Sequence, residues 1–351
     1  MGEHDEEKPT IERRDLLKLG TAATVGYLAR GVVPEASAAM PPLPINPVTP
    51  RAMPTRNLGR TGYRVGIFSL GGQAAVEQPD NEAVAVPIVE RALDLGVNYI
   101  DTSARYGGPE RWSERYVGQV MKRRRSQAFL ATKTHDRTRD GSLKLLAKSL
   151  ELLQTDHVDL WQIHNLAKNE EVEQIFAADG AVQALVKARE QGMVRFVGVT
   201  GHADPTVLME AIRRFPFDTV LMALNAADPH HLSFEKGLLP LAVEKEMGIV
   251  GMKIPARGRI LSSWTPPPPD QQRWGQVATR PGSITMKEAM RYVLSLPVST
   301  VIVGCDTIAQ VEENVQLARA FTPMSVTQMA EISTRTEPIK RQALFFRRWE
   351  A

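Results

Sequence analysis

Short apolar runs alternate with amphipathic stretches from about residue 63 to residue 304. The apolar runs are rich in Val, Ile and Thr, which is typical of β-strands. We place eight predicted strands at residues 65–70, 97–102, 128–132, 157–164, 194–200, 219–224, 248–254 and 299–304. Most of these strands are continuous apolar runs and not alternating ones, which indicates a sheet covered on both faces.

The stretches between the predicted strands carry helix signals. Ser142 can cap a helix in which leucines recur at spacings of three and four from residue 143 to residue 153. Asp204 precedes Pro205, the arrangement of an N-cap followed by proline at the first helical position. Thr285 and Glu288 fit a capping box. Strands and helices in this alternation predict repeated βα units and a parallel sheet.

Two architectures can hold such units. Eight of them over about 260 residues match a closed (β/α)8 barrel, the TIM barrel. An open, doubly wound sheet is the competing fold, and it predicts a Gly-x-Gly-x-x-Gly sequence after the first strand. Residues 71–75 are Gly-Gly-Gln-Ala-Ala, which lacks that pattern. We therefore predict a single α/β barrel domain over residues 56–322.

Composition excludes several classes of protein. The 351-residue chain is 43% hydrophobic and 24% charged, with a formal net charge of +3, a balance too mild to indicate nucleic-acid binding. The single cysteine, Cys305, excludes a disulfide within the chain and a cysteine-ligated metal centre. His135 and the pair His230-His231 lack a matching carboxylate spacing, so we expect loop histidines and no bound metal.

Residues 1–38 have the order of an export signal. Arg13 and Arg14 precede a leucine pair and a lysine, a weakly apolar stretch follows over residues 19–29, and residues 36–38 form an Ala-Ser-Ala cleavage site. The arginine pair resembles twin-arginine (Tat) signals, which indicates that the Tat export machinery carries the protein to the bacterial periplasm. The apolar stretch is too short to span a bilayer. A frayed cytoplasmic tail is the alternative.

Two further segments lie outside the predicted strands and helices of the barrel. Residues 39–55 contain six prolines among few charges, which predicts an extended linker. Residues 323–351 are expected to form a C-terminal helical extension that packs on the barrel. The loop at 262–281, with four consecutive prolines, is too long for a simple connector. It either covers the substrate mouth or is a stiff surface arm.

Three successive predicted strands end on polar residues that an apolar core does not favour. Asp101 ends the second strand, Lys133 follows the third and His164 ends the fourth. Tyr106 lies in the loop after Asp101. In a barrel all four would meet at the carboxyl ends of the strands, where active sites lie. Each residue alone has an ordinary structural explanation, but the shared position favours a catalytic group.

The sequence around these four residues resembles the aldo-keto reductase family. The matching elements are Asp-Thr-Ser-Ala-Arg-Tyr-Gly at 101–107, Ala-Thr-Lys at 131–133, Asp-Leu-Trp-Gln-Ile-His at 159–164, Val-Gly-Val-Thr at 197–200, Leu-Gly-Arg-Thr-Gly at 58–62 and Glu-Glu-Asn at 312–314. They extend over roughly residues 56–320 in the family's order and spacing. The resemblance implies hydride transfer between a nicotinamide cofactor, NAD or NADP, and a small-molecule carbonyl substrate.

The resemblance also implies a role for each of the four residues. Tyr106 would donate the proton to the carbonyl oxygen, where negative charge develops. A phenol with a pKa near ~10 needs help to do so at neutral pH, and the Lys133 ammonium would stabilise its anion. Asp101 would hold Lys133 by an ion pair, and His164 would hydrogen-bond the carbonyl oxygen.

A cofactor-binding set follows from the same resemblance. Its members are Gly71, Gly72, Asp101, Thr200, Asn225, Lys253, Gly304, Asp306, Glu313 and Asn314. Asp306 stands where the family commonly has Lys or Arg for the adenosine 2′-phosphate. A carboxylate repels that phosphate and can accept a hydrogen bond from a ribose hydroxyl, so we expect NAD to be favoured over NADP.

The nicotinamide pocket departs from the family pattern in three places. Thr200-Gly201-His202 replaces a Ser-Asn pair, an apolar residue near Leu221 replaces a glutamine, and Met252-Lys253 replaces an aromatic residue. These changes leave a second hypothesis open, a catalytically weak regulatory or scaffold protein that binds the cofactor. The complete set of four catalytic positions favours the enzyme.

Overall fold

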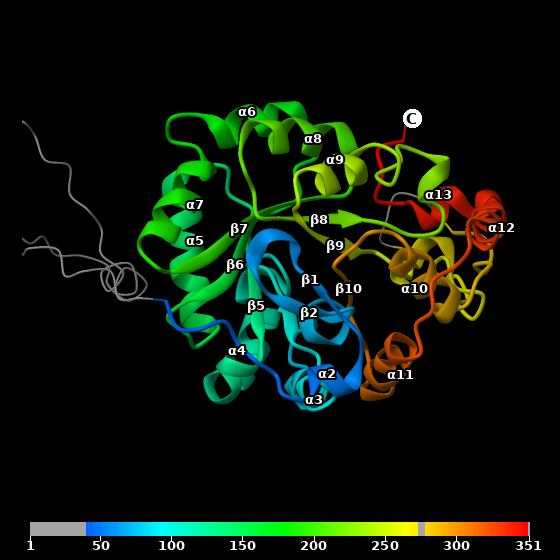
Figure 1. Ribbon diagram of the computed structural model, residues 1–351, viewed down its shortest axis with the longest axis horizontal. Helices are drawn as coiled ribbons and strands as arrows, with labels where there is room; N and C mark the ends of the chain where they lie inside the picture. Colours follow the sequence, from blue (N-terminus) through cyan, green and yellow to red (C-terminus); the bar gives the residue numbers. More distant parts are fainter. Residues whose placement is uncertain (1–39, 273–277, 350–351) are drawn as a thin grey trace, which may run out of the picture.

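Eight parallel strands close into a barrel in this computed structural model, which describes residues 40–272 and 278–349 (Figure 1). The strands pair around the barrel in the order β10-β3-β4-β5-β6-β7-β8-β9, so consecutive strands are neighbours throughout. Their bounds are β3 Phe68–Gly71, β4 Tyr99–Asp101, β5 Phe129–Thr134, β6 Val158–Ile163, β7 Val194–Gly201, β8 Thr219–Ala223, β9 Gly248–Met252 and β10 Thr300–Val303. The predicted (β/α)8 fold is therefore confirmed.

Helices connect the strands and surround the barrel (Figure 1). They are α2 Thr49–Ala52, α3 Glu82–Asp94, α4 Trp112–Arg124, α5 Arg139–Leu152, α6 Asn169–Phe176, α7 Ala181–Glu190, α8 Pro205–Arg214, α9 Leu238–Glu244, α10 Met286–Ser295, α11 Ile308–Arg319, α12 Val326–Thr336 and α13 Lys340–Ala343. The helices α12 and α13 fall in the predicted C-terminal helical extension. Short 3-10 turns, such as Gly59–Thr61 and Asp228–His230, lie in the connections.

Side chains fill the barrel interior, as the period-two geometry of a strand requires. One cluster of buried residues inside the barrel includes Tyr99 of β4, Phe129 of β5 and Leu160 of β6. Tyr99 and Phe129 stack with ring centroids 5.4 Å apart. The residues two positions further along each strand therefore point inward as well, nearer to the carboxyl end.

The first predicted strand is divided in two. Residues Arg64–Gly66 form β2, which pairs with β1 (Thr55–Asn57) in an antiparallel hairpin, and the barrel strand begins only at Phe68. The Tyr63 hydroxyl donates to the Asn98 carbonyl just before β4, so the hairpin covers the amino ends of the barrel strands. An apolar run alone does not separate a barrel strand from a hairpin that packs below it.

The prediction of an extended linker at residues 39–55 is wrong for its second half. The Asn46 amide donates to the carbonyls of Leu93 and Val97, and the Thr49 hydroxyl donates to the carbonyl of Gly96. Both Asn46 and Thr49 are buried against the end of α3. Prolines suggested a solvated chain, but here they confine the backbone to a path along the protein surface, where these polar side chains satisfy helix-end carbonyls.

The helix signals are confirmed with one exception. Asp204 caps α8, and Thr285 forms a capping box with Glu288 at the start of α10. Ser142 is not a cap: α5 starts three residues earlier, and Thr138 accepts the capping hydrogen bond from the Gly141 amide. The sequence has two hydroxyl residues at suitable spacing, and the apolar periodicity does not choose between them.

The predicted export signal at residues 1–38 lies outside the described residues. Among the helices that the structure describes, none is both long and apolar enough to cross a membrane.

Candidate active site

Asp101, Lys133, His164 and Tyr106 lie together at the carboxyl ends of three adjacent strands. Asp101 is the last residue of β4, Lys133 is the second-to-last residue of β5, and His164 directly follows β6. Tyr106 lies in the loop between β4 and α4 and packs edge-on against His164, with ring centroids 5.7 Å apart. The structure therefore brings all four predicted catalytic residues to one side of the barrel mouth.

A buried ion pair joins Lys133 and Asp101. The Lys133 ammonium donates to a carboxylate oxygen of Asp101 and, at 2.8 Å, to the carbonyl of Thr102. Both side chains are only 1% exposed. The Lys133 Nζ lies 4.8 Å from the centroid of the Tyr106 ring. A buried charge needs such partners, because removal from water is costly when no opposite charge compensates it.

Gln162 holds the second oxygen of Asp101. Gln162 lies in β6, two residues before His164, and its Nε2 donates to Asp101 Oδ2 at 3.2 Å. Sequence reasoning missed this residue, although Leu160, Gln162 and His164 share the inward face of one strand. A polar residue on an otherwise apolar inward face is the signal that could have identified it.

Burial and charge compete over the titration of this group. Burial raises the pKa of Asp101, and Lys133 and Gln162 oppose that rise. Burial also raises the pKa of the Tyr106 phenol, while the neighbouring Lys133 ammonium opposes the rise. The pKa of Lys133 is raised because attraction to Asp101 and Tyr106 outweighs the opposing effect of burial. The ammonium form of Lys133 is therefore strongly favoured beside Tyr106.

His164 is held neutral by its surroundings. Burial and the nearby Lys133 lower its pKa well below 6.5. Its Nδ1 lies 3.0 Å from the Ser103 hydroxyl oxygen, which already accepts a hydrogen bond from the Arg105 amide. The Ser103 hydroxyl can therefore donate to Nδ1, a tautomer that leaves the proton of the neutral ring on Nε2. Ser103 was not predicted as a site residue.

A cavity of about 1280 Å³ opens beside Tyr106 and His164. Its lining is mixed, and it contains the polar residues Arg105, His135, Asn165 and Lys168 and the aromatic residues Trp112, Phe345 and Phe346. A second cavity of about 700 Å³ lies around the β1 hairpin and Leu294–Ser299 at the amino ends of the strands. Of these two cavities, only the first is lined by predicted catalytic residues, namely Tyr106 and His164.

Of the predicted cofactor-binding residues, Lys253 lines this cavity. It follows β9 with a positive φ of 64°, and its Nζ donates to Gln73 Oε1 at 2.9 Å. Burial, together with the nearby Arg257, lowers the pKa of the Lys253 ammonium to about 7. Arg257 also lines the cavity and pairs with Glu77.

The glycines of the predicted cofactor set have close packing contacts. A Cβ at Gly72 would lie 2.5 Å from Ser113 Oγ and 2.7 Å from the carbonyl oxygen of Asp101. A Cβ at Gly71 would lie 3.2 Å from the amide nitrogen of Gly304, and one at Gly304 would lie 3.0 Å from the carbonyl oxygen of Gln73. These contacts give the three glycines a structural reason to lack side chains, and a cofactor role for them stays a prediction.

The remaining members are engaged with the protein itself. Thr200 accepts from the Asn165 amide at 2.7 Å, and Asn314 donates to the sulfur of Cys305 at 3.4 Å. Asp306, just before the residue that caps α11, and Glu313, in the second turn of that helix, are exposed. Asn225 donates to the carbonyls of Lys253 and Ala343. Their roles toward a cofactor also stay predictions.

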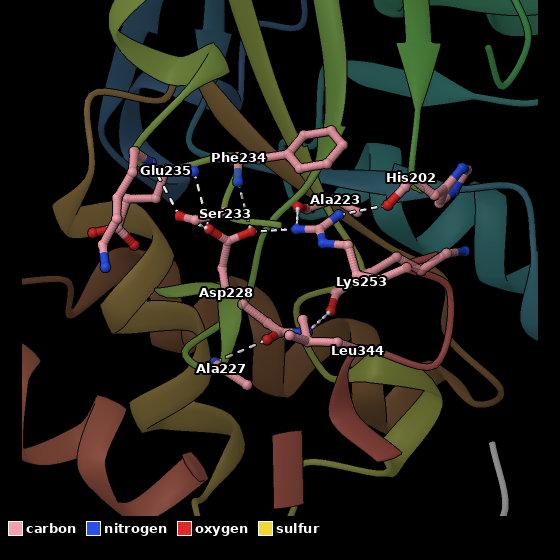
Figure 2. A network of polar contacts seen from close by, with 12 residues as sticks. His202, Ala223, Ala227, Asp228, Ser233, Phe234, Glu235, Lys253 and Leu344 are labelled. Atoms are coloured by element: carbon pink, nitrogen blue, oxygen red, sulfur yellow. Dashed lines mark hydrogen bonds and ion pairs between the residues drawn. The ribbon is translucent and has the colours of Figure 1, made fainter. Parts of the chain in front are cut away.

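The C-terminal segment reaches the barrel mouth, which the sequence did not predict in this detail. Phe345 and Phe346 line the cavity, and Arg347 is buried, with a guanidinium that pairs with Asp228. Figure 2 shows Asp228 with Ser233, Phe234 and Glu235 around it. No described residue of the long loop at 262–281 lines the cavity.

The histidines outside the cavity have protein partners. His230 Nε2 lies 2.8 Å from the Ser333 carbonyl oxygen, and the His231 ring stacks on Trp349. Within residues 40–272 and 278–349, no group of three or more His, Cys, Asp or Glu residues is arranged to hold a metal ion.

The fold and site define a class of protein: a (β/α)8 barrel with a lysine–carboxylate pair, a tyrosine and a histidine at its mouth. The model of the aldo/keto reductase family matches residues 64–334, and the chain belongs to that family. The members of this family are oxidoreductases that in general use NAD or NADP.

Named relatives and solved structures agree. The chain is 29% identical over 311 residues to L-galactose dehydrogenase of Arabidopsis thaliana, covering 81% of this chain and 95% of the relative. It is 28% identical over 228 residues to 6-dehydroglucose reductase of Novosphingobium aromaticivorans, covering 60% of this chain and 71% of the relative. The holo form of an aldo-keto reductase from Bacillus halodurans superposes with a TM-score of 0.66 at 25% identity, covering 81% of this chain and 96% of that one.

Proposed function

We propose that this protein reduces an aldehyde or ketone with NADH or NADPH, or oxidises the corresponding alcohol, and that Tyr106 is the proton donor. The observation that carries the proposal is the buried pair of Lys133 and Asp101 beside the Tyr106 ring. A fixed cation at this place lowers the cost of forming the Tyr106 phenolate when the proton leaves. The pair has no better structural explanation, since an apolar pair would fill the space at less cost.

Each residue then has one task. Tyr106 passes its phenolic proton to the carbonyl oxygen as negative charge develops there, and Lys133 stabilises the phenolate left behind. Asp101 and Gln162 orient Lys133. His164, neutral and protonated on Nε2, donates to the same carbonyl oxygen and orients the substrate.

The residues present fit a nicotinamide dinucleotide. Its ring would supply the hydride. Lys253 and Arg257 line the cavity with the positive charge that its diphosphate needs. A lysine whose pKa lies at about 7 gains a full charge when a phosphate approaches, so binding at this residue is expected to depend on pH.

The exposed carboxylate of Asp306 favours NAD over NADP. Asp306 precedes Thr307, which caps α11, and its amide donates to Gln310 Oε1 at 2.7 Å. Neither Asp306 nor Gln310 has the positively charged side chain that a 2′-phosphate requires.

The lining of the cavity supports a small polar substrate. Arginine, lysine, histidine and asparagine side chains border Tyr106 and His164, together with aromatic rings on which an apolar face can pack. Two relatives bear names that include sugars, L-galactose and 6-dehydroglucose. We therefore propose a hydroxylated carbonyl compound as the substrate class.

A regulatory or scaffold protein that binds a nicotinamide cofactor is the second candidate. Gly201, Leu221 and Met252 stand where the resembling family has polar or aromatic nicotinamide contacts. These departures support weak catalysis, whereas the complete group of Asp101, Lys133, Tyr106 and His164 supports an enzyme.

A single-turnover experiment separates the two candidates. The protein is mixed with a sub-stoichiometric amount of NADH or NADPH, and oxidation of the bound nicotinamide is followed after addition of a hydroxylated aldehyde. Rapid oxidation with at least one dinucleotide supports the enzyme. Tight binding without oxidation by any of a panel of aldehydes and ketones would leave the regulatory protein.

We also propose export through the Tat machinery to the periplasm. The support is the order of Arg13-Arg14, the apolar stretch 19–29 and Ala36-Ser37-Ala38. Since that machinery moves folded proteins, the cofactor can be loaded before export. Replacing both arginines with lysine should keep the protein in the cytoplasm, and cell fractionation measures this. An unchanged distribution would contradict the proposal.

A further inference from the structure

The last described residues of the chain form a strap across the barrel mouth. This C-terminal strap, residues 344–349, follows α13 and passes over the carboxyl ends of β7 and β8. The Arg348 amide donates to the Ala203 carbonyl at 3.1 Å and joins the strap to the loop after β7, and within the strap the Arg347 amide donates to the Leu344 carbonyl at 2.9 Å. Phe345 and Phe346 of the strap line the cavity, and no residue of the strap takes part in the proposed proton transfer.

Arg347 anchors the strap in the interior. Its guanidinium donates to the carbonyl of His202 at 2.5 Å and to the carbonyl of Ala223 at 2.9 Å. It also pairs with Asp228, and the side chains of both residues are 0% exposed. Figure 2 shows His202 and Asp228 on opposite sides of this network, with Ala223 between them. The Nη2 of Arg347 donates to both Ala223 and Asp228, and the Nη1 donates to His202.

Asp228 is prepared for this pairing. Its carboxylate also accepts from the Ser233 hydroxyl at 2.7 Å and from the amides of Phe234 and Glu235 at 3.2 and 2.9 Å. The Arg347 guanidinium lies 3.9 Å from the centroid of the Phe234 ring. A guanidinium with so many fixed partners forms a specific buried ion pair and not an accidental surface contact.

Phe346 fills the space next to the ion pair of Arg347 and Asp228. Its ring packs against the cluster inside the barrel that contains Leu221, Ala223 and Met252. It lies 6.2 Å from the His202 ring, centroid to centroid. The strap therefore covers the strand ends across the barrel from Lys133, where three family contacts to nicotinamide are missing.

That place matters to the proposed reaction. Tyr106 and His164, which follow β4 and β6, would hold the carbonyl oxygen. Hydride transfer brings the reacting atoms to about 3–3.5 Å, so the nicotinamide ring has to lie in the same mouth, against the part that Tyr106 and His164 leave free. Phe346 and Arg347 occupy that part.

We propose that the C-terminal strap is an autoinhibitory gate, whose Phe346 and Arg347 must leave the mouth before the nicotinamide end of the dinucleotide can bind. The inference rests on the proposed function. Release exposes the carbonyls of His202 and Ala223, and Asp228 then keeps its hydrogen bonds to Ser233, Phe234 and Glu235. The apparent dissociation constant of the dinucleotide increases as the fraction of molecules with an open gate decreases. Mutations that open the gate therefore lower this dissociation constant.

Hydrogen exchange of the full-length protein tests the movement directly. Peptides that contain residues 345–349 are followed with and without saturating NADH or NADPH. We expect faster exchange in the strap when the dinucleotide is bound, while peptides from β4 to β6 become protected. Unchanged or slower exchange in the strap would make it a fixed wall of the cavity and overturn the gate.

Three opening variants and one control test the energetic part by dinucleotide titration. Phe346→Ala and Arg347→Gln should lower the dissociation constant by roughly 10-fold. The control is Arg123→Gln, because Arg123 lies in the last turn of α4, outside the strap, and pairs with Glu90 from a side chain that is 60% exposed, so this change should leave affinity unchanged. Removal of residues 345–351 serves as the third opening variant.

The outcomes separate the two proposals. Tighter binding by the opening variants, with the control unchanged, supports the gate. Equal or weaker binding by Phe346→Ala and by the truncated protein overturns the gate and leaves the proposed function intact. If neither the full-length nor the truncated protein binds NADH or NADPH, the proposed function itself fails and the gate fails with it.

Discussion

The Lys133 ammonium and the Asp101 carboxylate form an ion pair in which each side chain is 1% exposed. Such a pair stabilises a fold weakly, because the cost of removing both charges from water offsets most of their attraction. The position of the ion pair favours a functional role, since the ammonium lies 4.8 Å from the centre of the Tyr106 ring. The protein thus keeps a cation next to a phenol in a place from which water is largely excluded.

Replacing Tyr106 with phenylalanine removes the proposed proton donor and keeps the ring. We expect turnover to fall by roughly 10²–10⁴-fold, while the dissociation constant of the dinucleotide changes little. Steady-state kinetics and fluorescence titration measure the two quantities. Tyr292→Phe is the control, because the Tyr292 hydroxyl donates to Glu235 Oε2 from α10, outside the cavity. Full activity in Tyr106→Phe would contradict the assigned role.

Gln162 is expected to act by positioning Asp101. Gln162→Leu removes the hydrogen bond from Nε2, and the pKa of Asp101 should rise further, because that bond opposes the effect of burial. The acid limb of the kcat/KM profile should then move to higher pH, with activity at neutral pH reduced roughly 10-fold. A uniform loss of activity at every pH, without a shift of the profile, would indicate a merely structural role.

Much of this arrangement could be predicted from the sequence. The eight strands recur at regular spacings, three of the four predicted catalytic residues stand at successive strand ends, and the strand ends of a parallel barrel necessarily meet on one face. Asp101, Lys133 and His164 needed only that rule. Gln162 was missed because it lies inside a strand, where apolar neighbours concealed the period-two pattern of Leu160, Gln162 and His164.

Other features depend on contacts between distant parts of the chain. Arg347 and Asp228 are separated by 119 positions, and neither has a local motif that announces its partner. Asn46 and Thr49 looked like part of a proline-rich linker until the end of α3 supplied carbonyls for their side chains. The residue pattern within one segment predicts the secondary structure of that segment well. The same pattern carries little information on which distant segment packs against it.

Acid should destabilise the fold partly through His164. Its pKa in the folded protein lies well below 6.5, since burial and Lys133 disfavour the imidazolium. As the pH falls below about 6.5, the unfolded chain takes up a proton that the folded one does not, so stability decreases by up to about 1.4 kcal/mol per pH unit from this group. Urea unfolding of the protein and of His164→Asn between pH 7.5 and 5.5 measures it. Equal slopes for the two proteins would contradict the expectation.

Gly72 is a position where a structural role and a cofactor role give different results. Gly72→Ala places a methyl group 2.7 Å from the Asp101 carbonyl oxygen and 2.5 Å from Ser113 Oγ. We expect a loss of roughly 1–3 kcal/mol in the free energy of unfolding and a lower kcat as Asp101 is displaced. Gly237→Ala is the control, since the nearest atom would lie at 3.3 Å. Unchanged stability with weaker dinucleotide binding would favour direct cofactor contact.

Asp306 should decide between the two dinucleotides. It is exposed next to Thr307 at the start of α11, and Asp306→Arg exchanges a repulsive carboxylate for a cation that can bind a 2′-phosphate in two places. The protein itself should bind NADH more tightly than NADPH, and the variant should shift the ratio of the two dissociation constants toward NADPH by roughly 10-fold or more. Glu190→Arg, an equal change of charge at the exposed end of α7, controls for the overall charge of the protein. A clear preference of the unmodified protein for NADPH, or the same shift in both variants, would show that Asp306 does not face the adenosine ribose.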